Sequence, residues 1–383
     1  MKIVTLDQVA EERKGQAKSG DPKDLSIGLE HLIPECLHVE EWDDSGKNTF
    51  TKVFCKGDIL FGRRRAYLKK AAIAPFDGVC SGDITVIKSK KSPLIPELLP
   101  FVIQNDALFD YAVKNSAGSL SPRVKWEYLK TFSFRLPEKN EQQRLLEKLT
   151  SIDSEELAAQ DALQAAIDMR QSLLDDAFGG NIQRYASGME SVRLSAFATK
   201  VDRKNKNLET KRVITISSQD GIVDQQEYFN KSVASKDLTG YYLLKKGEFA
   251  YNKSYSIGYP VGSIKRLDRY DEGALSNLYI CFSINDDYLS DYIKLYFEST
   301  VWYAQIFGIV EEGARAHGLL NVTKSDFFAT EHLLTKDRAA ETSLIDDESK
   351  LSQLITSLTE KVAACHALRK ALIYEAFNIP EEE

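Results

Sequence analysis

An internal repeat that spans the whole chain constrains its fold more than any other feature. Three pairs of similar segments occur in the same order, at offsets of 188, 190 and 199 residues. They are VTLDQVA and VRLSAFA, which begin at Val4 and Val192, KGDILFG and KGEFAYN, which begin at Lys56 and Lys246, and LDDAF and IYEAF, which begin at Leu174 and Ile373. Because the order is kept and there are only two copies, we expect a tandem pair of related modules rather than a solenoid.

Each copy ends in a segment that predicts one long helix, residues 138–180 in the first and 338–379 in the second. Apolar residues recur there at alternating spacings of three and four, which is the pattern of a helix that pairs along a narrow seam. The pairing positions include Leu145, Leu149, Ile152 and Leu163 in the first helix, and Leu351, Ile355, Leu358 and Val362 in the second. At 1.5 Å per residue, such a helix is about 58 Å long. We expect the two helices to pair with each other; a coiled coil with another protein is the alternative.

The segments before each helix predict α+β domains. Short apolar or β-branched runs separated by glycines indicate strands, and longer apolar-periodic runs indicate helices. The expected strands are 59–61, 71–74 and 84–87 in the first copy, and 249–251, 261–264 and 278–284 in the second. The expected helices are 98–113, with Pro100 disturbing its start, and the aromatic-rich segment 288–307.

The charge of the chain is unevenly distributed. The net charge is −7, yet residues 138–178 hold ten acidic and four basic residues, and residues 337–383 hold ten acidic and five basic ones. The remainder contains 41 basic and 37 acidic residues, and residues 51–91 alone contain ten basic and three acidic ones. The acidity therefore belongs to the two helical segments, and the other domains can offer a positive surface to nucleic acid.

Several classes of protein are disfavoured by the sequence. No apolar run is long enough for a membrane span, and the first residues lack the apolar core of a signal peptide. The five cysteines are widely spaced without CxxC, which argues against disulfides and zinc and favours the cytoplasm. A GxxxxGK[ST] loop, a glycine-rich methyl-donor loop and an Asn-Pro-Pro-Tyr or Asp-Pro-Pro-Tyr motif are all missing. We therefore expect neither an ATPase nor a methyltransferase, and no cofactor or metal.

The ordered motifs resemble the DNA-specificity subunits of type I restriction–modification systems. In the first copy these are KGDILFGRRRAYLKKAAIAPFDGVCSGDITVIKS and NSAGSLSPRVKWEYLKTFSFRLPEKNEQQRLLEKL. In the second copy Lys246-Gly247-Glu248, Asn252-Lys253, Gly313 and Val322 follow the same order, while LLTKDRAAETSLI lacks the Pro and Glu-Gln of its counterpart. Each motif alone is weak, but the ordered set occurs twice and is followed by a long helix each time.

The resemblance implies an architecture and a role. The fold would be α+β, with two target-recognition domains in a pseudo-symmetric tandem repeat, residues 1–137 and 191–334. Two long antiparallel coiled-coil helices, residues 138–180 and 338–379, would separate them. Each domain would read one half of an asymmetric bipartite site in double-stranded DNA. Two methyltransferase subunits and translocating nuclease subunits would dock on the helices, so the chain itself would not be an enzyme. Alternatives are a related system whose partner fuses methylation and cleavage, and a coiled-coil scaffold that binds no DNA.

Candidate DNA contacts lie in four short segments. Arginine can hold phosphate or grip guanine bidentately, asparagine can read adenine, and small hydroxyls suit phosphate. The candidates are Arg63, Arg64, Arg65, Lys69 and Lys70, then Ser119, Ser121, Arg123 and Lys125, and in the second copy Asn252, Lys253, Ser254, Tyr255 and Arg315. A solvated basic face and simple connecting turns remain the alternatives. Three consecutive arginines can reach one partner only if the chain turns there, which Gly62 favours.

Overall fold

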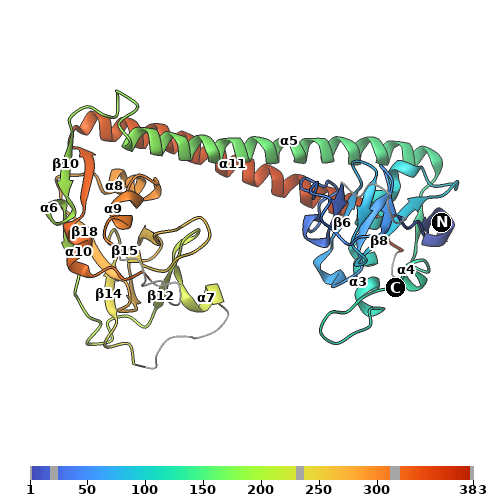
Figure 1. Cartoon of the computed structure of the whole chain (residues 1–383), viewed down its shortest axis with the longest axis horizontal. Coiled ribbons are helices and arrows are strands. Elements are labelled where there is room, and N and C mark those ends of the chain that lie inside the picture. The colour runs from blue at the N-terminus through green and yellow to red at the C-terminus, as the bar shows by residue number, and fades with distance from the viewer. Residues whose placement is uncertain (1, 18–24, 230–236, 311–319, 380–383) are drawn as a thin grey trace. The chain divides into compact units, whose positions relative to one another are not determined.

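A computed structural model describes residues 2–17, 25–229, 237–310 and 320–379. The chain divides into two compact units: unit 1 comprises Met1–Asp161 and Leu358–Glu383, and unit 2 comprises Ala162–Ser357. Both units are mixed α/β, and the long helices α5 (Lys139–Phe178) and α11 (Arg338–Phe377) each contribute a segment to both (Figure 1). None of the helices in the described residues is long and apolar enough to cross a membrane.

The described residues of unit 1 form three small sheets before α5. A four-stranded antiparallel sheet has the order β2-β8-β5-β6, a three-stranded sheet has the order β3-β7-β4, and β1 pairs with β9. The strands are β1 (Lys2–Thr5), β2 (Ala10–Glu12), β3 (Ser26–Ile27), β4 (Lys52–Phe54), β5 (Ile59–Gly62), β6 (Ala71–Ile73), β7 (Gly78–Cys80), β8 (Ile84–Ser89) and β9 (Ser133–Leu136). The helices are α1 (Leu6–Val9), η1 (Leu29–His31), η2 (Ala66–Leu68), η3 (Pro96–Leu98), α2 (Leu99–Ile103), α3 (Asp106–Lys114) and α4 (Trp126–Leu129).

In the part of unit 2 that the structure describes there are two four-stranded sheets and a two-stranded one. Their orders are β11-β18-β15-β16, β13-β12-β17-β14 and β10-β19. The strands are β10 (Met189–Arg193), β11 (Ala198–Lys200), β12 (Val213–Ser217), β13 (Gly221–Asp224), β14 (Tyr242–Lys245), β15 (Phe249–Asn252), β16 (Ser263–Arg266), β17 (Glu272–Leu275), β18 (Ile280–Ile284) and β19 (Glu331–Thr335). The helices are α6 (Leu194–Phe197), α7 (Gln225–Phe229), α8 (Ser290–Glu298), α9 (Tyr303–Phe307) and α10 (Lys324–Ala329).

All six strands expected from the sequence have a counterpart, although the one expected at 261–264 begins at Ser263, and both expected helices are interrupted. The segment 98–113 forms the end of η3, then α2 and α3. Pro100 lies in the first turn of α2, at the start that it was expected to disturb, and a break follows at Asn105. Asn105 is extended (ψ 128°), and its side chain accepts the N–H of Ala107, so it caps a new helix. The segment 288–307 is divided in the same way at Ser299, which is extended after α8.

The repeated Lys-Gly-Asp and Lys-Gly-Glu segments form the same turn in the two units. Gly57 and Gly247 have φ of +87° and +85°, a conformation that favours glycine. The next residue, Asp58, accepts the N–H of Cys55 (2.7 Å) and the guanidinium of Arg13 (2.5 Å).

In unit 2, Glu248 accepts the N–H of Lys245 (2.8 Å) and the guanidinium of Arg203 (2.7 Å). The same sequence offset separates all three pairs of equivalent residues. The pairs are Asp58 and Glu248, Cys55 and Lys245, and Arg13 and Arg203. The motif that most clearly marks the repeat therefore holds a turn against an earlier strand, and its carboxylate is already engaged inside the protein.

Both long helices end in an Ala-Phe pair that is buried in a globular core. Phe178, at the end of α5, packs in unit 2 against Tyr292 and Tyr296, with ring centroids 5.1 Å apart in both cases. Phe377, at the end of α11, packs in unit 1 against Phe134 at 6.1 Å. The α5 end is closed by Gly180 in the left-handed region (φ +76°), with hydrogen bonds of the Schellman type. These contacts explain why the LDDAF and IYEAF segments are alike.

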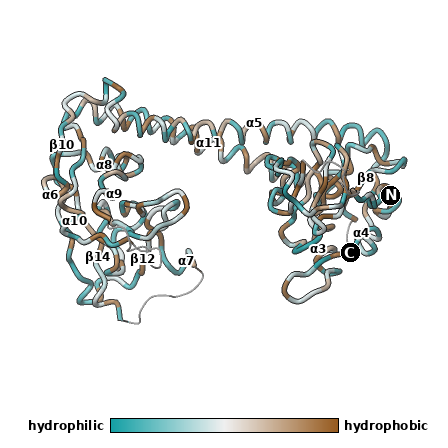
Figure 2. Tube along the Cα trace, viewed as in Figure 1, coloured by the Kyte–Doolittle hydropathy of each residue, from teal (hydrophilic) through white to brown (hydrophobic). Residues whose placement is uncertain are grey.

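Within each unit a segment of α5 lies against a segment of α11 (Figure 1). In unit 1, Leu145 and Leu149 share a core with Ile373, and farther along α5 Glu155 pairs with Lys361 (2.9 Å). In unit 2, Leu174 shares a core with Leu344. Positions farther along α5 thus meet earlier positions of α11. Figure 2 shows that hydrophilic and hydrophobic residues alternate along both helices.

Charged residues of the two long helices form buried ionic clusters. In unit 1, Arg369 (4% exposed) contacts Asp153 (3.2 Å) and Glu156 (3.5 Å), the latter only 6% exposed. Arg369 also donates to the carbonyl of Glu35 (2.8 Å). In unit 2, Arg170 pairs with Glu298 and with Glu348 (2.5 Å). These residues are therefore part of the helix packing itself.

Candidate nucleic-acid interface

Three loops of unit 1 meet at the end of β5. Backbone hydrogen bonds join Arg63 to Asp83, Val124 to Arg63, and Arg65 to Pro122, at 2.8 to 3.0 Å. Arg123 also exchanges two backbone bonds with Ala117. Two of the four segments with candidate residues, around Arg64 and around Arg123, are thereby fixed side by side although they lie far apart in the sequence.

The carboxylate of Asp83 lies between Arg64 and Arg123. Its Oδ1 accepts from Nε of Arg123 at 2.6 Å, and its Oδ2 accepts from Nη2 of Arg123 and from Nη1 of Arg64, both at 3.3 Å. Nη2 of Arg64 donates to the hydroxyl of Ser121 at 3.1 Å. The hydrogen bond from Arg123 holds the pKa of Asp83 below its usual range, so this carboxylate stays ionised.

The other candidates in this region differ in exposure. Arg65 has φ +53°, so the chain does turn there, and its side chain is exposed, with no hydrogen-bond partner among the described residues. Arg63 is half-buried, and its Nε lacks a hydrogen-bond partner within the described part of the chain. Ser119 and Lys125 are exposed. We call the cluster around Asp83 the arginine platform and define it as Arg63, Arg64, Arg65, Asp83, Ser121 and Arg123.

Lys69 and Lys70 belong to a different environment. Lys69, also left-handed (φ +51°), pairs with Asp106 (2.6 Å) and Glu35 (3.3 Å). Lys70 donates to the carbonyl of Leu29 at 2.9 Å. Both amines are therefore engaged inside unit 1. The turn at Arg65 divides the basic stretch into three arginines at the platform and two lysines that tie loops together.

The candidate segment of unit 2 follows β15. Asn252 uses its side-chain oxygen to accept the N–H of Ser254 at 3.0 Å, and Lys253 donates to the carbonyl of Val322 at 3.2 Å. Tyr255 and Ile257 are strongly exposed, Ile257 to 91%. This loop offers an aromatic and an aliphatic side chain where unit 1 offers arginines. Arg315 lies outside the described residues.

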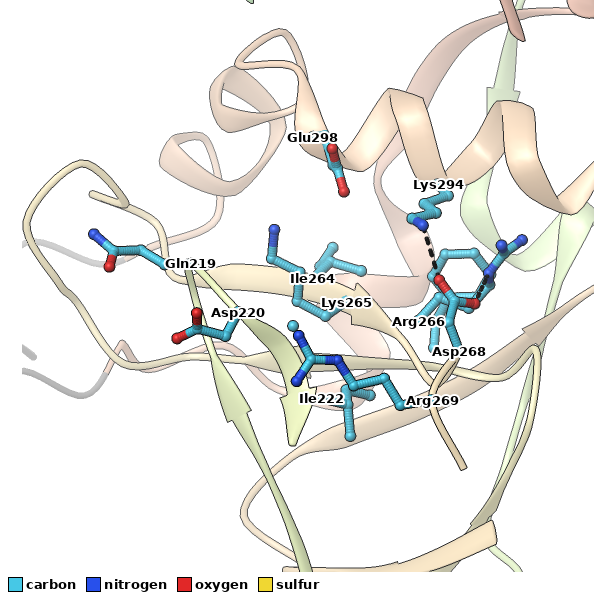
Figure 3. Close-up of a pocket in the computed structure, with 12 residues that line it drawn as sticks. Gln219, Asp220, Ile222, Ile264, Lys265, Arg266, Asp268, Arg269, Lys294 and Glu298 are labelled. Atoms are coloured by element: carbon cyan, nitrogen blue, oxygen red, sulfur yellow. Dashed lines mark hydrogen bonds and ion pairs between the residues drawn. The ribbon is translucent and has the colours of Figure 1, made fainter. Parts of the chain in front are cut away.

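A cationic pocket that the sequence did not indicate lies next to this loop. It has a volume of about 240 Å³ and is lined by residues of β16, α8 and the β12–β13 turn, among them Lys265, Arg269, Lys294, Asp220 and Glu298. Figure 3 shows Lys265 entering the pocket from β16, with Lys294 and Glu298 above it on α8 and Arg269 below.

Lys265 is the cation of the pocket whose pKa burial lowers. Lys294 pairs with Asp268 (2.8 Å), and Glu298 pairs with Arg170. The amine of Lys265 has no hydrogen bond or ion pair within the described residues and lies 5.7 Å from the ring centre of Tyr259. An anion entering the pocket would restore the interactions that this amine lost on leaving water.

The predicted helix-pairing residues fall into two environments. Leu145 and Leu149 are buried in the core of unit 1 together with the end of α11. Ile152 and Leu163 on α5 are half-buried. The corresponding set on α11, all half-buried, is Leu351, Ile355, Leu358 and Val362. A half-buried seam is what two helices produce when they cover one another on one side only.

Comparisons with known proteins point to one family. Residues 2–168 match the model of the type I restriction modification DNA specificity domain. Over 193 residues the chain is 29% identical to the type I restriction enzyme EcoDI specificity subunit of Escherichia coli. The match spans 47% of this chain and 41% of that protein.

Two solved structures have a similar fold over nearly the whole chain. One is a chain from a structure on complex assembly and conformational transition of the type I R-M system, with 17% identity, a TM-score of 0.58, and coverage of 98% of this chain and 97% of that one. The other is the S subunit of a type I restriction–modification system from M. genitalium, with 13% identity, a TM-score of 0.55, and coverage of 100% and 96%.

Proposed function

We propose that the chain is a sequence-specific DNA-binding subunit, on the premise that its residues 2–168 match the model of the type I restriction modification DNA specificity domain. It would recognise a bipartite target for a type I restriction–modification complex in the cytoplasm. The family match carries this proposal. The arginine platform supports it, because it gathers cationic side chains from separate loops on an exposed surface.

We propose that residues 1–137 and 191–334 are two target-recognition domains that arose by duplication. The strand order β2-β8-β5-β6 in unit 1 corresponds to β11-β18-β15-β16 in unit 2, and the Gly57 and Gly247 turns correspond as well. After the equivalent strands β5 and β15, one unit carries arginines and the other Asn252, Lys253, Ser254 and Tyr255. Different side chains in equivalent places select different bases, so the two half-sites would differ in sequence.

In unit 2 we propose that Lys265 and Arg269 contact the DNA backbone. Cationic side chains at the edge of a base-reading loop position a protein on DNA through phosphates, whatever the sequence. Ser218 supports this placement, since it bonds Ser256 (3.3 Å) of the exposed loop and Ser263 (2.9 Å) of β16. The pocket and the loop are thereby linked.

We propose that residues 138–180 and 338–379 form an antiparallel coiled coil that separates the two domains. The opposite order of contacts along α5 and α11 within each unit supports the antiparallel pairing. The acidic surface of these helices suits docking of other proteins better than docking of DNA. Methyltransferase subunits, two in number, and translocating nuclease subunits would bind there. A partner that fuses methylation and cleavage is the second candidate system.

The experiment is selection of DNA by the purified full chain. A library of duplexes with a long randomised segment is incubated with the protein, and the retained molecules are sequenced. We expect two short conserved blocks, different from one another and at a fixed spacing. A library that emerges without any enriched sequence, at low and at moderate salt, would contradict sequence-specific binding.

Incubation of the same full chain with a methyl donor and the selected duplex tests the non-catalytic role. We expect neither methyl transfer nor strand cleavage, because both activities would belong to the docking partners. Turnover by the purified chain alone would contradict this assignment.

A further inference from the structure

Asp83 is the acidic residue at the centre of the arginine platform, where the proposed function places DNA. A carboxylate there reduces the attraction for phosphate, because it cancels one of the surrounding positive charges. A surface shaped for phosphate affinity alone would bind more tightly without it. Asp83 must therefore contribute something other than phosphate affinity, and its hydrogen bonds to Arg123 indicate what this is.

The carboxylate of Asp83 accepts two hydrogen bonds from the guanidinium of Arg123. Nε and Nη2 of Arg123 face Oδ1 and Oδ2 at 2.6 and 3.3 Å, which fixes the plane of the guanidinium as well as its position. The backbone of Arg123 is fixed too, by its paired bonds with Ala117. An exposed arginine without such support would have to give up its side-chain freedom on binding.

The unused donors of Arg123 form a bidentate end. A guanidinium has five N–H groups, of which Asp83 takes one from Nε and one from Nη2. Nη1 makes only a long contact of 3.5 Å with the carbonyl of Ser121. The terminal pair Nη1 and Nη2 can therefore offer two parallel N–H groups, the arrangement that matches O6 and N7 of guanine in the major groove.

Arg64 is less suited to the same task. Its Nη1 donates to Asp83 and its Nη2 donates to Ser121, and its side chain is half-buried, whereas that of Arg123 is exposed. Its Nε is buried without a hydrogen-bond partner within the described residues. Arg64 therefore adds positive charge to the platform, and Arg123 is the arginine whose terminal N–H groups are exposed for a ligand.

We propose that Asp83 is a positioning residue for base readout, which orients Arg123 so that it reads a guanine in the half-site of unit 1. This inference rests on the proposed function and adds the chemical identity of one base that the chain recognises. Asp83 is not among the contacts expected from the sequence, because it acts on DNA only through Arg123.

The test compares selection by the wild-type full chain with selection by Asp83→Asn and by Arg123→Lys. Asp83→Asn keeps the side-chain shape and removes the charge, and Arg123→Lys keeps the charge and removes the fork. For both variants we expect the preference for guanine at one position of one half-site to fall by about tenfold or more, with the other half-site unchanged. Competition with non-cognate duplex should show binding by Asp83→Asn that is equal to or tighter than that of the wild type.

The control is Glu11→Gln. Glu11 is an exposed acid of unit 1 that pairs with Lys88 at 2.8 Å, so its replacement removes the same charge away from the platform. We expect it to select the wild-type sequences. Thermal melting checks that every variant is folded, and Arg123→Lys provides the test if Asp83→Asn fails to fold.

Two results would overturn the proposal. One is that the duplexes selected by Asp83→Asn or by Arg123→Lys show the same base preferences as those selected by the wild type. The other is a uniform rise in affinity for every duplex with Asp83→Asn, which would leave Asp83 as a charge without a positioning role. If the wild-type chain itself selects no sequence, the failure is that of the proposed DNA-specificity function.

Discussion

At the scale of single residues, a left-handed backbone conformation divides a basic run into two roles. Arg65 turns the chain, so that Arg63 and Arg64 join the loop around Arg123, whereas Lys69 is directed to Asp106 and Glu35. Burial alone would raise the pKa of Glu35, but hydrogen bonds from Lys370 and Lys69 outweigh it and hold that pKa at about 2. Charge density along the sequence therefore overstates the cations that are free for a ligand.

Replacement of Arg63, Arg64 and Arg65 together by alanine should weaken DNA binding and flatten its salt dependence. Each phosphate contact that is lost should reduce the log–log slope by up to about one unit. The measurement is the apparent Kd for the selected duplex at a series of salt concentrations. Lys69→Gln is the matched control from the same stretch, and we expect it to lower stability and leave the slope unchanged. An unaltered slope in the triple variant would leave these arginines as solvated charge.

His332 gives unit 2 a specific sensitivity to acid. It is 1% exposed in β19, its ring nitrogens share hydrogen bonds with Tyr296 and Thr330 (both 2.8 Å), and burial lowers its pKa to about 4. Because the unfolded chain binds a proton near pH 6.5 and the folded chain does not, stability is lost as pH falls from about 6.5 towards 4.

Between pH 7 and pH 5 this group should remove about 2 kcal/mol from the free energy of unfolding. Urea denaturation of the wild type and of His332→Phe at both pH values measures the effect. The variant should be less stable at pH 7, because two hydroxyl groups lose their partner, yet it should lose about 2 kcal/mol less on acidification. Equal losses in the two proteins would show that His332 is not the titrating group.

At the scale of elements, the long helices are held by apolar ends and by ionic clusters between them. Phe178 closes α5 inside unit 2 and Phe377 closes α11 inside unit 1, while Arg369 and Arg170 replace apolar residues along the pairing surface. Buried ion pairs contribute little net stability, but the removal of one partner is costly because it leaves a buried charge uncompensated. In paired helices such polar positions serve to fix the register.

Arg369→Met should therefore destabilise unit 1 by about 3–5 kcal/mol, because Asp153 and Glu156 lose their common partner. The double variant Glu156→Leu with Arg369→Met should regain most of that loss, since an apolar pair suits the seam. Denaturant unfolding of the single and double variants measures both effects. A cost below about 1 kcal/mol for the single variant would contradict a buried, coupled cluster.

At the scale of the whole molecule, two similar strand orders carry different exposed side chains. The first unit presents guanidinium groups from two loops around the carboxylate of Asp83, and the second presents Tyr255 and Ile257 beside the Lys265 pocket. If each unit reads its own half-site, each should act as a replaceable module.

Exchange of residues 191–334 for the corresponding segment of a related chain should change only one half of the selected sequence. The other half and the platform-dependent guanine preference should remain, because Arg123 and Asp83 lie in the segment that is kept. The readout is the same duplex selection with the chimeric full chain. Altered bases in both halves would argue against modular recognition.

The sequence by itself indicated the paired segments, the strands that flank each turn and the two long helices. These features are local: the helical spacing, the glycine that allows a positive φ and the Ala-Phe ends are all written in short segments. Arg13 and Arg203, which bind the repeated carboxylates, are separated by the same offset as those carboxylates. A comparison of the two copies could therefore have identified them from the sequence.

Only the tertiary structure decided which charges remain available. Asp83 is 40 residues from Arg123 in sequence, and Lys265, Arg269 and Lys294 come from different places in unit 2, so no spacing rule links them. Lys69 and Lys70 carry the same charge as the arginines beside them, yet their partners lie elsewhere in unit 1. The physical reason is that pairing between charges acts over a few ångströms of space, and the fold alone sets those distances.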